Sequence, residues 1–105
     1  MAVRNEAELE RLFQADLIKE LYAIFPGCLI IKNDANYLQG IPDLSIFWHN
    51  RWAMLECKAS ERSRHQPNQD YYVETLGEMS YAAFIYPENK DHILAELQRS
   101  FGASW

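Results

Sequence analysis

The 105-residue sequence predicts an α/β fold in which a mixed four-stranded sheet is flanked by helices. Apolar residues at helical spacing occupy the first quarter of the chain and recur twice later, and short β-branched and aromatic runs lie between them. The composition is 49% hydrophobic, which is enough for the core of one domain, and the length is too short for two. We therefore expect one domain over residues 1–105, ordered helix, three strands, helix, strand, helix.

The first predicted element is a helix over residues 5–25, for which Asn5 is a favoured N-cap residue. With residues placed at about 100° per position, the mean direction of the apolar side chains falls on Glu10. A carboxylate in the middle of a buried stripe is costly unless a cation or a hydrogen-bond donor meets it. Glu10 is therefore either a partly exposed residue near the helix start or part of a polar site, with Glu6, and more weakly Glu20, as competitors for that role.

A short apolar strand over residues 28–31 follows, because Pro26-Gly27 ends the helix. A polar loop over residues 32–37 comes next. Its Lys32 and Asn33 are of the types that contact a phosphate or a base, and ordinary solvation of the loop is the alternative. The loop leads to the corner at which the next strand begins.

The next two strands form a β-hairpin, since two apolar runs flank a polar connection at residues 49–51. Side chains two apart lie on one face of a strand, so Glu56 and Lys58 share a face at the open end of the hairpin. The register decides whether Asp43 joins them. If the first two residues of the connection form the loop, Asp43 faces Glu56 directly, with Cβ atoms roughly 4.5–5.5 Å apart.

Two carboxylates at that separation raise each other's pKa unless a cation lies between them. A hard cation such as Mg²⁺ suits a site that offers few carboxylates together with waters and a phosphate. The alternative is a surface cluster of ion pairs on an ordinary hairpin. The apolar residues around Glu56 and Lys58 favour a buried polar site instead.

A polar, basic segment follows the hairpin, and its candidates for contact with nucleic acid are Arg62, Arg64, His65 and Gln66. Pro67 predicts the first turn of a second helix, because proline is favoured at that position. Gly77 predicts the end of the same helix. The segment thus connects the charged end of the hairpin to the second helix.

Gln66 and Gln69 both fall at helical spacing in this predicted helix, and Gln66 is close enough to Gln69 to be confused with it in any role. Solvation on the helix surface is the alternative for both. A fourth strand over residues 79–86 and an amphipathic helix over residues 91–101 complete the predicted fold.

The charged positions resemble a known signature. Pro42-Asp43, twelve intervening residues and Glu56-Cys57-Lys58 look like the motif of the PD-(D/E)XK nuclease superfamily. The preceding Gly40-Ile41 and a Gln shortly after the Lys are similar to its VRR-NUC branch, which includes small standalone phage nucleases and the nuclease domain of the Fanconi-associated nuclease. The predicted element order also resembles the restriction-endonuclease-like αβββαβ core of this superfamily, with one extra C-terminal helix.

The resemblance implies a metal-dependent DNA endonuclease that hydrolyses phosphodiester bonds. Asp43 and Glu56 would then hold one or two Mg²⁺ or Mn²⁺ ions, with the backbone carbonyl of Cys57 as a further oxygen ligand. Lys58 would orient or deprotonate the attacking water and offset negative charge on the phosphorus. These roles are what the family pattern assigns to the matching positions.

Two further pairs resemble the family pattern. Glu10, followed four residues later by Gln14, is similar to the acidic residue of the first helix that completes the metal site. Gln69, followed three residues later by Tyr72, is similar to the Gln-x-x-aromatic motif that follows the catalytic Lys. The resemblance therefore adds Glu10 and Gln69 to the expected catalytic residues.

The net charge of −5 counts against binding of DNA by electrostatics alone, although bound cations reverse the local sign. The small size and the lack of a sequence-reading module favour recognition of DNA structure, such as four-way (Holliday) junctions in phage or prophage replication, recombination or repair. Some small relatives act as homodimers. The alternatives are flap, nick or nonspecific duplex cleavage, a partner protein that supplies a basic surface, and a catalytically inactive module that binds nucleic acid or protein.

Cys28 and Cys57 have no paired spacing, so neither a disulfide framework nor a zinc site is predicted. The chain begins without an apolar leader and contains no apolar run of membrane-spanning length. We expect a cytoplasmic protein without membrane contact, located in the cytoplasm of the bacterial host if a phage encodes it.

Overall fold

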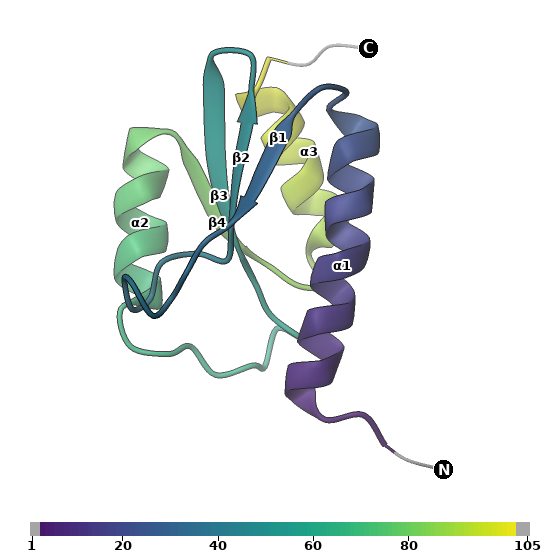
Figure 1. The fold of residues 1–105 in the computed structure, drawn as a ribbon, viewed down its shortest axis with the longest axis vertical. Coiled ribbons are helices and arrows are strands. Elements are labelled where there is room, and N and C mark those ends of the chain that lie inside the picture. Colours follow the sequence, from purple (N-terminus) through teal and green to yellow (C-terminus); the bar gives the residue numbers. More distant parts are fainter. Residues whose placement is uncertain (1–2, 103–105) are drawn as a thin grey trace.

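The computed structural model describes residues 3–102 and confirms the predicted order of elements (Figure 1). The sheet has the order β1-β2-β3-β4, with β1/β2 and β2/β3 antiparallel and β3/β4 parallel, so it is mixed as predicted. No helix within residues 3–102 is long and apolar enough to span a lipid bilayer. The elements are α1 (Glu6–Ile24), β1 (Leu29–Lys32), β2 (Leu44–Trp48), β3 (Arg51–Cys57), α2 (Gln69–Met79), β4 (Tyr81–Ile85) and α3 (Lys90–Ser100).

Helices lie on both faces of the sheet, with α2 on one side and α1 and α3 on the other (Figure 1). Leu17 and Leu21, one turn apart on α1, share a single buried cluster with Leu55 and Cys57 of β3. Glu56 alternates with these two residues, so it points to the face that α2 covers. The fully buried apolar side chains are Leu17, Leu21, Phe25, Leu44, Ile46, Ala53, Leu55, Cys57, Ile85 and Leu97.

The β2–β3 hairpin has the two-residue loop that brings the charged residues together. His49-Asn50 form the loop, and the register runs from Trp48 opposite Arg51 to Leu44 opposite Leu55. His49 has a φ of 57°, a left-handed conformation in which His is among the more frequent non-glycine residues. One step beyond Leu44, the same register places Asp43 opposite Glu56.

Both predicted limits of the second helix are wrong. The helix begins after Pro67, because Asn68 has a left-handed φ of 72° at the N-cap, which breaks the helical path. It also continues through Gly77 to Met79. Gly77 lies where α2 passes over β4, at a point where a Cβ atom would lie 3.7 Å from the carbonyl oxygen of Ala82. The fourth strand accordingly starts two residues later than predicted.

The N-terminal part of α1 extends past the end of the sheet (Figure 1). Asn5 caps this helix as predicted, its side chain accepting a hydrogen bond from the Glu8 N–H at 2.8 Å. The first strand is shifted by one residue, so Lys32 ends β1 instead of starting a loop. The overhanging part of α1, the open end of the hairpin and the start of α2 therefore meet at one end of the sheet.

Candidate functional site

The two carboxylates at the open end of the hairpin are joined through the backbone. Asp43 Oδ2 accepts a hydrogen bond from the Cys57 N–H at 2.9 Å, and Glu56 Oε1 accepts one from the Asp43 N–H at 3.2 Å. Glu56 is only 3% exposed. These bonds fix both side chains where the strands separate, with one Asp43 oxygen not used by the Cys57 contact.

Lys58 is the buried cation of the site, with 4% of its surface exposed. Its Nζ donates hydrogen bonds to the Gln69 side-chain oxygen at 2.7 Å and to the Arg64 carbonyl at 3.0 Å. Glu56 Oε2 lies 3.8 Å from the same nitrogen. Lys58 therefore donates to two acceptor oxygens and lies near a third, that of Glu56.

The side chain of Gln69 links Glu56 to Lys58. Its Nε2 donates to Glu56 Oε2 at 2.8 Å, and its Oε1 accepts from Lys58 and from the Gln66 backbone N–H, each at 2.7 Å. Of the two candidate glutamines, the structure therefore places the side chain of Gln69 in the network. Gln66 lies before α2 and contributes its backbone N–H.

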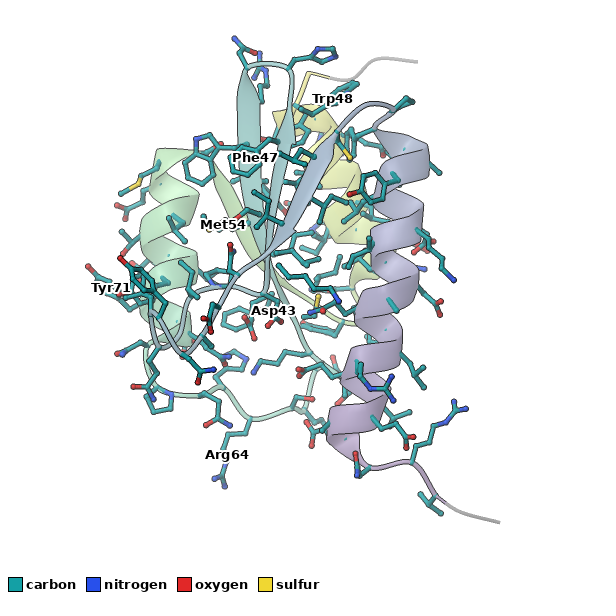
Figure 2. The ribbon with its side chains drawn as sticks, in the orientation of Figure 1. Asp43, Phe47, Trp48, Met54, Arg64 and Tyr71 are labelled. Atoms are coloured by element: carbon teal, nitrogen blue, oxygen red, sulfur yellow. The ribbon has the colours of Figure 1, made fainter. Side chains whose placement is uncertain are left out.

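These residues face one pocket of about 340 Å³. Figure 2 shows Asp43 at the end of the sheet and Arg64 on the segment beyond it. The pocket brings together residues of α1, the hairpin, the connecting segment and the start of α2. Its lining consists of Glu6, Ala7, Glu10, Asp43, Glu56, Lys58, Arg64, Gln66 and Gln69.

The three acidic candidates of the first helix lie in different surroundings. Glu10 is half-buried and lines the pocket, and Glu6, which is exposed, lies at its border. Glu20 lies elsewhere, because its carboxylate pairs with Lys90 of α3 at 3.1 Å. Glu10 is thus the half-buried carboxylate that α1 brings to the site.

Burial dominates the electrostatics of the pocket. It raises the pKa of Glu56 to about 8, and the neighbouring Asp43 carboxylate adds to this increase while Lys58 opposes it. Burial also raises the pKa of Asp43 and the pKa of Glu10 above their usual values. Burial therefore disfavours the ionised forms of all three acidic groups.

The donor set fits a hard divalent cation. Within residues 3–102, no three Asp, Glu, His or Cys side chains are already arranged as a metal cluster. Mg²⁺ does not require such a cluster, because it is usually bound through one or two carboxylates together with waters and substrate phosphates. A cation beside Asp43 and Glu56 would also stabilise the ionised carboxylates that burial disfavours.

Cys57 contributes to the site through its backbone N–H, which donates to Asp43. Its thiol is fully buried. Burial raises the pKa of this thiol, so the group stays neutral. The part assigned to the Cys57 carbonyl as a metal ligand stays a prediction.

Two of the expected nucleic-acid contacts lie away from the pocket lining. Lys32 is exposed at the end of β1. Asn33 donates from its side chain to the Pro42 carbonyl at 2.9 Å and to the Ser45 hydroxyl at 2.8 Å. These bonds brace the corner that precedes Asp43, so Asn33 supports the site from behind.

The basic residues of the segment after the hairpin also differ in their relation to the pocket. Both arginines are exposed, and Arg64 is among the residues that line the pocket whereas Arg62 is not. His65 is engaged by two residues that the sequence analysis missed, Asp70 and Phe84. The strand register places Phe84 beside Glu56, and the sequence contains no local signal for this pairing.

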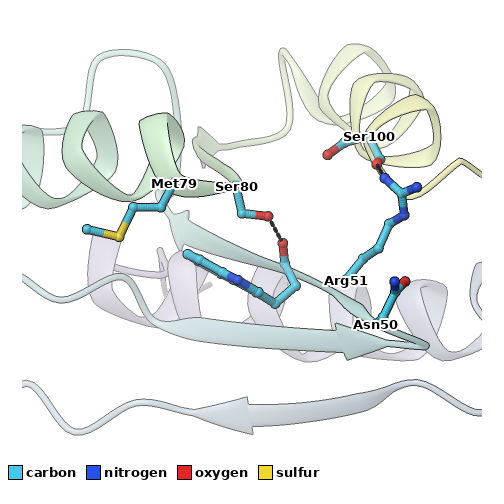
Figure 3. Close-up of a pocket in the computed structure, with 6 residues that line it drawn as sticks. Asn50, Arg51, Met79, Ser80 and Ser100 are labelled. Carbon is cyan, nitrogen blue, oxygen red and sulfur yellow. Dashed lines mark hydrogen bonds between the residues drawn. The ribbon is translucent and has the colours of Figure 1, made fainter.

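Two other cavities lack this concentration of charge. One, of about 430 Å³, lies at the turn end of the hairpin, where Arg51 donates to the Ser100 carbonyl at 2.9 Å and the Ser80 hydroxyl donates to the Trp52 carbonyl (Figure 3). No acidic residue lines it. The other, of about 460 Å³ and mostly apolar, is bordered by Tyr37 and Met54.

The site pocket therefore combines buried carboxylates, an ammonium group and a positioned amide. This set can bind a divalent cation and a phosphate group together, because carboxylates suit the former and the Lys58 and Arg64 cations suit the latter. Comparisons of the chain with protein-family models, with curated proteins and with solved structures find no match.

Proposed function

We propose that the chain is a metal-dependent DNA endonuclease that hydrolyses phosphodiester bonds, with a site similar to that of PD-(D/E)XK nucleases of the VRR-NUC branch. One observation carries the proposal. Asp43, Glu56, Lys58 and Gln69 form a single hydrogen-bonded network on the wall of one pocket, and Glu10 reaches the same pocket from α1.

Asp43 and Glu56 would hold one or two Mg²⁺ or Mn²⁺ ions, with Glu10 and the Cys57 carbonyl as further oxygen ligands. When bound, such an ion supplies Lewis acidity toward a phosphoryl oxygen and makes a coordinated water more acidic. The raised pKa values of the two hairpin carboxylates support this assignment, because a cation in the pocket favours their ionised forms.

Lys58 would orient the attacking water and offset the charge that develops on the phosphoryl oxygens. Its acceptor neighbours suit an ammonium group, which favours the role of donor over that of proton acceptor. Gln69 holds both Lys58 and Glu56, so it keeps the amine and the carboxylate at a fixed separation. Arg64, which lines the pocket and has an exposed side chain, would contact a phosphate.

The substrate proposal is branched DNA, including four-way junctions, bound by a homodimer. The chain carries a net charge of −5, so a single copy offers little general attraction for duplex DNA. Recognition of DNA shape, together with the second copy of the site in a homodimer, would compensate for this weak attraction. Flap or nonspecific duplex cleavage is the alternative within the same chemistry, and a catalytically inactive binding module is the alternative outside it.

The test is cleavage of labelled four-way junction, flap and linear duplex DNA with Mg²⁺ or Mn²⁺. Wild type is compared with Lys58→Ala and, as a matched control, with Lys90→Ala, which removes a surface lysine that pairs with Glu20. We expect cleavage that EDTA and Lys58→Ala abolish and Lys90→Ala preserves, with the junction cut fastest. Binding of DNA by wild type without cleavage under either metal would favour the inactive binding module.

A further inference from the structure

The segment that connects β3 to α2 supplies backbone groups to the site pocket. We call residues 59–68 the strap. Its Arg64 carbonyl accepts a hydrogen bond from Lys58 at 3.0 Å, and the Gln66 N–H donates to Gln69 at 2.7 Å. Two main-chain groups of the strap thus hold the side chains that form the network with Glu56.

His65 lies between these two strap residues, and its ring makes two contacts. Its Nδ1 lies 2.7 Å from Asp70 Oδ1 in the first turn of α2. Its ring stacks on Phe84, with the centroids 4.0 Å apart and the ring planes at 14°. The strap is therefore attached both to α2 and to the sheet at the residue that separates Arg64 from Gln66.

Phe84 connects this attachment to the charged residues. In the parallel pairing of β3 with β4, Phe84 is the register partner of Glu56, so the two side chains lie on the same face of the sheet. The stacked ring of His65 is thereby held against the strand position next to the buried carboxylate. A shift of the strap would move the Arg64 carbonyl relative to Lys58.

From these contacts we propose that His65 is a positioning residue for Lys58. It holds the strap so that the Arg64 carbonyl and the Gln66 N–H keep Lys58 and Gln69 in place. The expected effect of His65 on catalysis rests on the proposed function, whereas its effect on the position of Lys58 does not. The expected contact of His65 with nucleic acid stays a prediction, although one ring face lies on Phe84 and Nδ1 faces Asp70.

The two attachments differ in strength. The Asp70 side chain is 75% exposed and that of His65 38% exposed, and exposed ion pairs contribute little. Stacking on Phe84 covers one face of each ring and should fix the strap more firmly. An aromatic replacement at position 65 should therefore retain most of the positioning, whereas removal of the ring should not.

The kinetic test compares His65→Ala, His65→Phe and Arg64→Ala on the DNA that wild type cuts best. Misplacement of a catalytic group by about 1 Å can cost about 100-fold in rate, so His65→Ala should lower kcat by roughly 10- to 100-fold. His65→Phe should restore most of the loss. Arg64→Ala keeps the main-chain carbonyl, so it should raise KM with a much smaller change in kcat. His92→Ala, which removes another exposed histidine paired with a carboxylate, should match wild type.

A second measurement does not depend on nuclease activity. The Lys58 ammonium is buried and hydrogen-bonded, so its protons should exchange slowly and give a side-chain ¹H–¹⁵N correlation in the metal-free protein. His65→Ala should lose or broaden this signal, and His65→Phe and His92→Ala should keep it. Circular dichroism identifies any variant that fails to fold, in which case His65→Gln, also lacking the stacked ring, takes the place of His65→Ala.

The outcomes separate the two proposals. A Lys58 signal that persists in a folded His65→Ala or His65→Gln variant, or a kcat that stays at the wild-type value in it, would overturn the role of His65. Failure of wild type to cut any DNA, together with loss of the Lys58 signal in the ring-deleted variant, would overturn the nuclease function and leave the role of His65 supported. Failure of His65→Phe to restore the signal would contradict the stacking argument.

Discussion

The two ends of the β2–β3 hairpin differ in chemistry, because one is aromatic and the other is charged. At the turn end, Phe25 lies 5.1 Å from Trp48 and 5.1 Å from Phe101, measured between ring centroids, and the rings form a compact aromatic group. At the open end, Asp43 and Glu56 are held side by side with limited compensating charge. An apolar cluster and a buried charged site therefore lie at opposite ends of one hairpin.

The difference indicates how the domain divides stability from chemistry. Burial of aromatic side chains is strongly favourable, whereas burial of charges costs free energy that their mutual attraction does not always recover. The open end retains charges that a purely structural hairpin would not need. We infer that the aromatic end stabilises the strands, and that the open end uses this stability to hold acidic groups close together.

The largest expected effect comes from removing a charge at the open end. Asp43→Asn keeps an oxygen that can accept from the Cys57 N–H, and it removes the repulsion with Glu56. We expect cleavage to fall on the order of 10³-fold or more, because metal-supplied charge stabilisation is worth several kcal/mol. The melting temperature should stay the same or rise. A large drop in melting temperature would show that the pair is needed for folding.

The next effect tests the aromatic end. Phe25→Ala should destabilise the fold by about 3–5 kcal/mol, because it opens a cavity where the ring is fully buried. Cleavage per folded molecule should be preserved at a temperature where the variant remains native. Urea unfolding gives the stability, with Tyr22→Ala on the exposed face of α1 as the control. A variant that is stable yet inactive would contradict the division between the two ends.

The pH dependence of stability should report the buried acids. Because the pKa of Glu56 rises from 4.5 to about 8 on folding, the folded state binds more protons than the unfolded state between these values. The stability of the metal-free protein should therefore fall as pH rises from about 4.5 to about 8. Urea midpoints across this range measure the fall. The fall in stability should be shallower in Asp43→Asn. A urea midpoint of wild type that rises with pH would contradict the raised pKa of Glu56.

The smallest effect distinguishes two acidic residues of one helix. Glu20→Gln breaks a surface ion pair with Lys90, so it should cost less than about 1 kcal/mol and leave cleavage unchanged. Glu10→Gln should reduce cleavage, because this half-buried carboxylate lines the pocket. The two variants remove the same charge from α1. Equal activities for both would remove Glu10 from the site.

The sequence predicts the site best where the chemistry follows from periodicity. Alternation along β3 places Glu56 and Lys58 on one face, and a two-residue loop is enough to set Asp43 opposite Glu56. The helical direction of α1 likewise points Glu10 toward the polar pocket. These relations are local, so a single sequence can carry them.

The limits of α2 and the surroundings of His65 show what sequence patterns leave out. Pro67 and Gly77 are ordinary signals of a helix start and end, but the helix begins after a left-handed Asn68 and continues through Gly77, which packs against β4. The stacking of His65 on Phe84 depends on how two distant segments meet. Tertiary packing decides both features, and periodicity contains no information about it.

The most direct test of the central claim is calorimetric titration of Mn²⁺ into the metal-free protein at neutral pH. We expect wild type and Glu20→Gln to bind one or two ions per chain. Asp43→Asn should bind them roughly tenfold more weakly or worse, since even the outer partners of metal ligands change affinity by this amount. Absence of binding by wild type at millimolar Mn²⁺, or equal binding by Asp43→Asn, would contradict the assignment of the open end as a metal site.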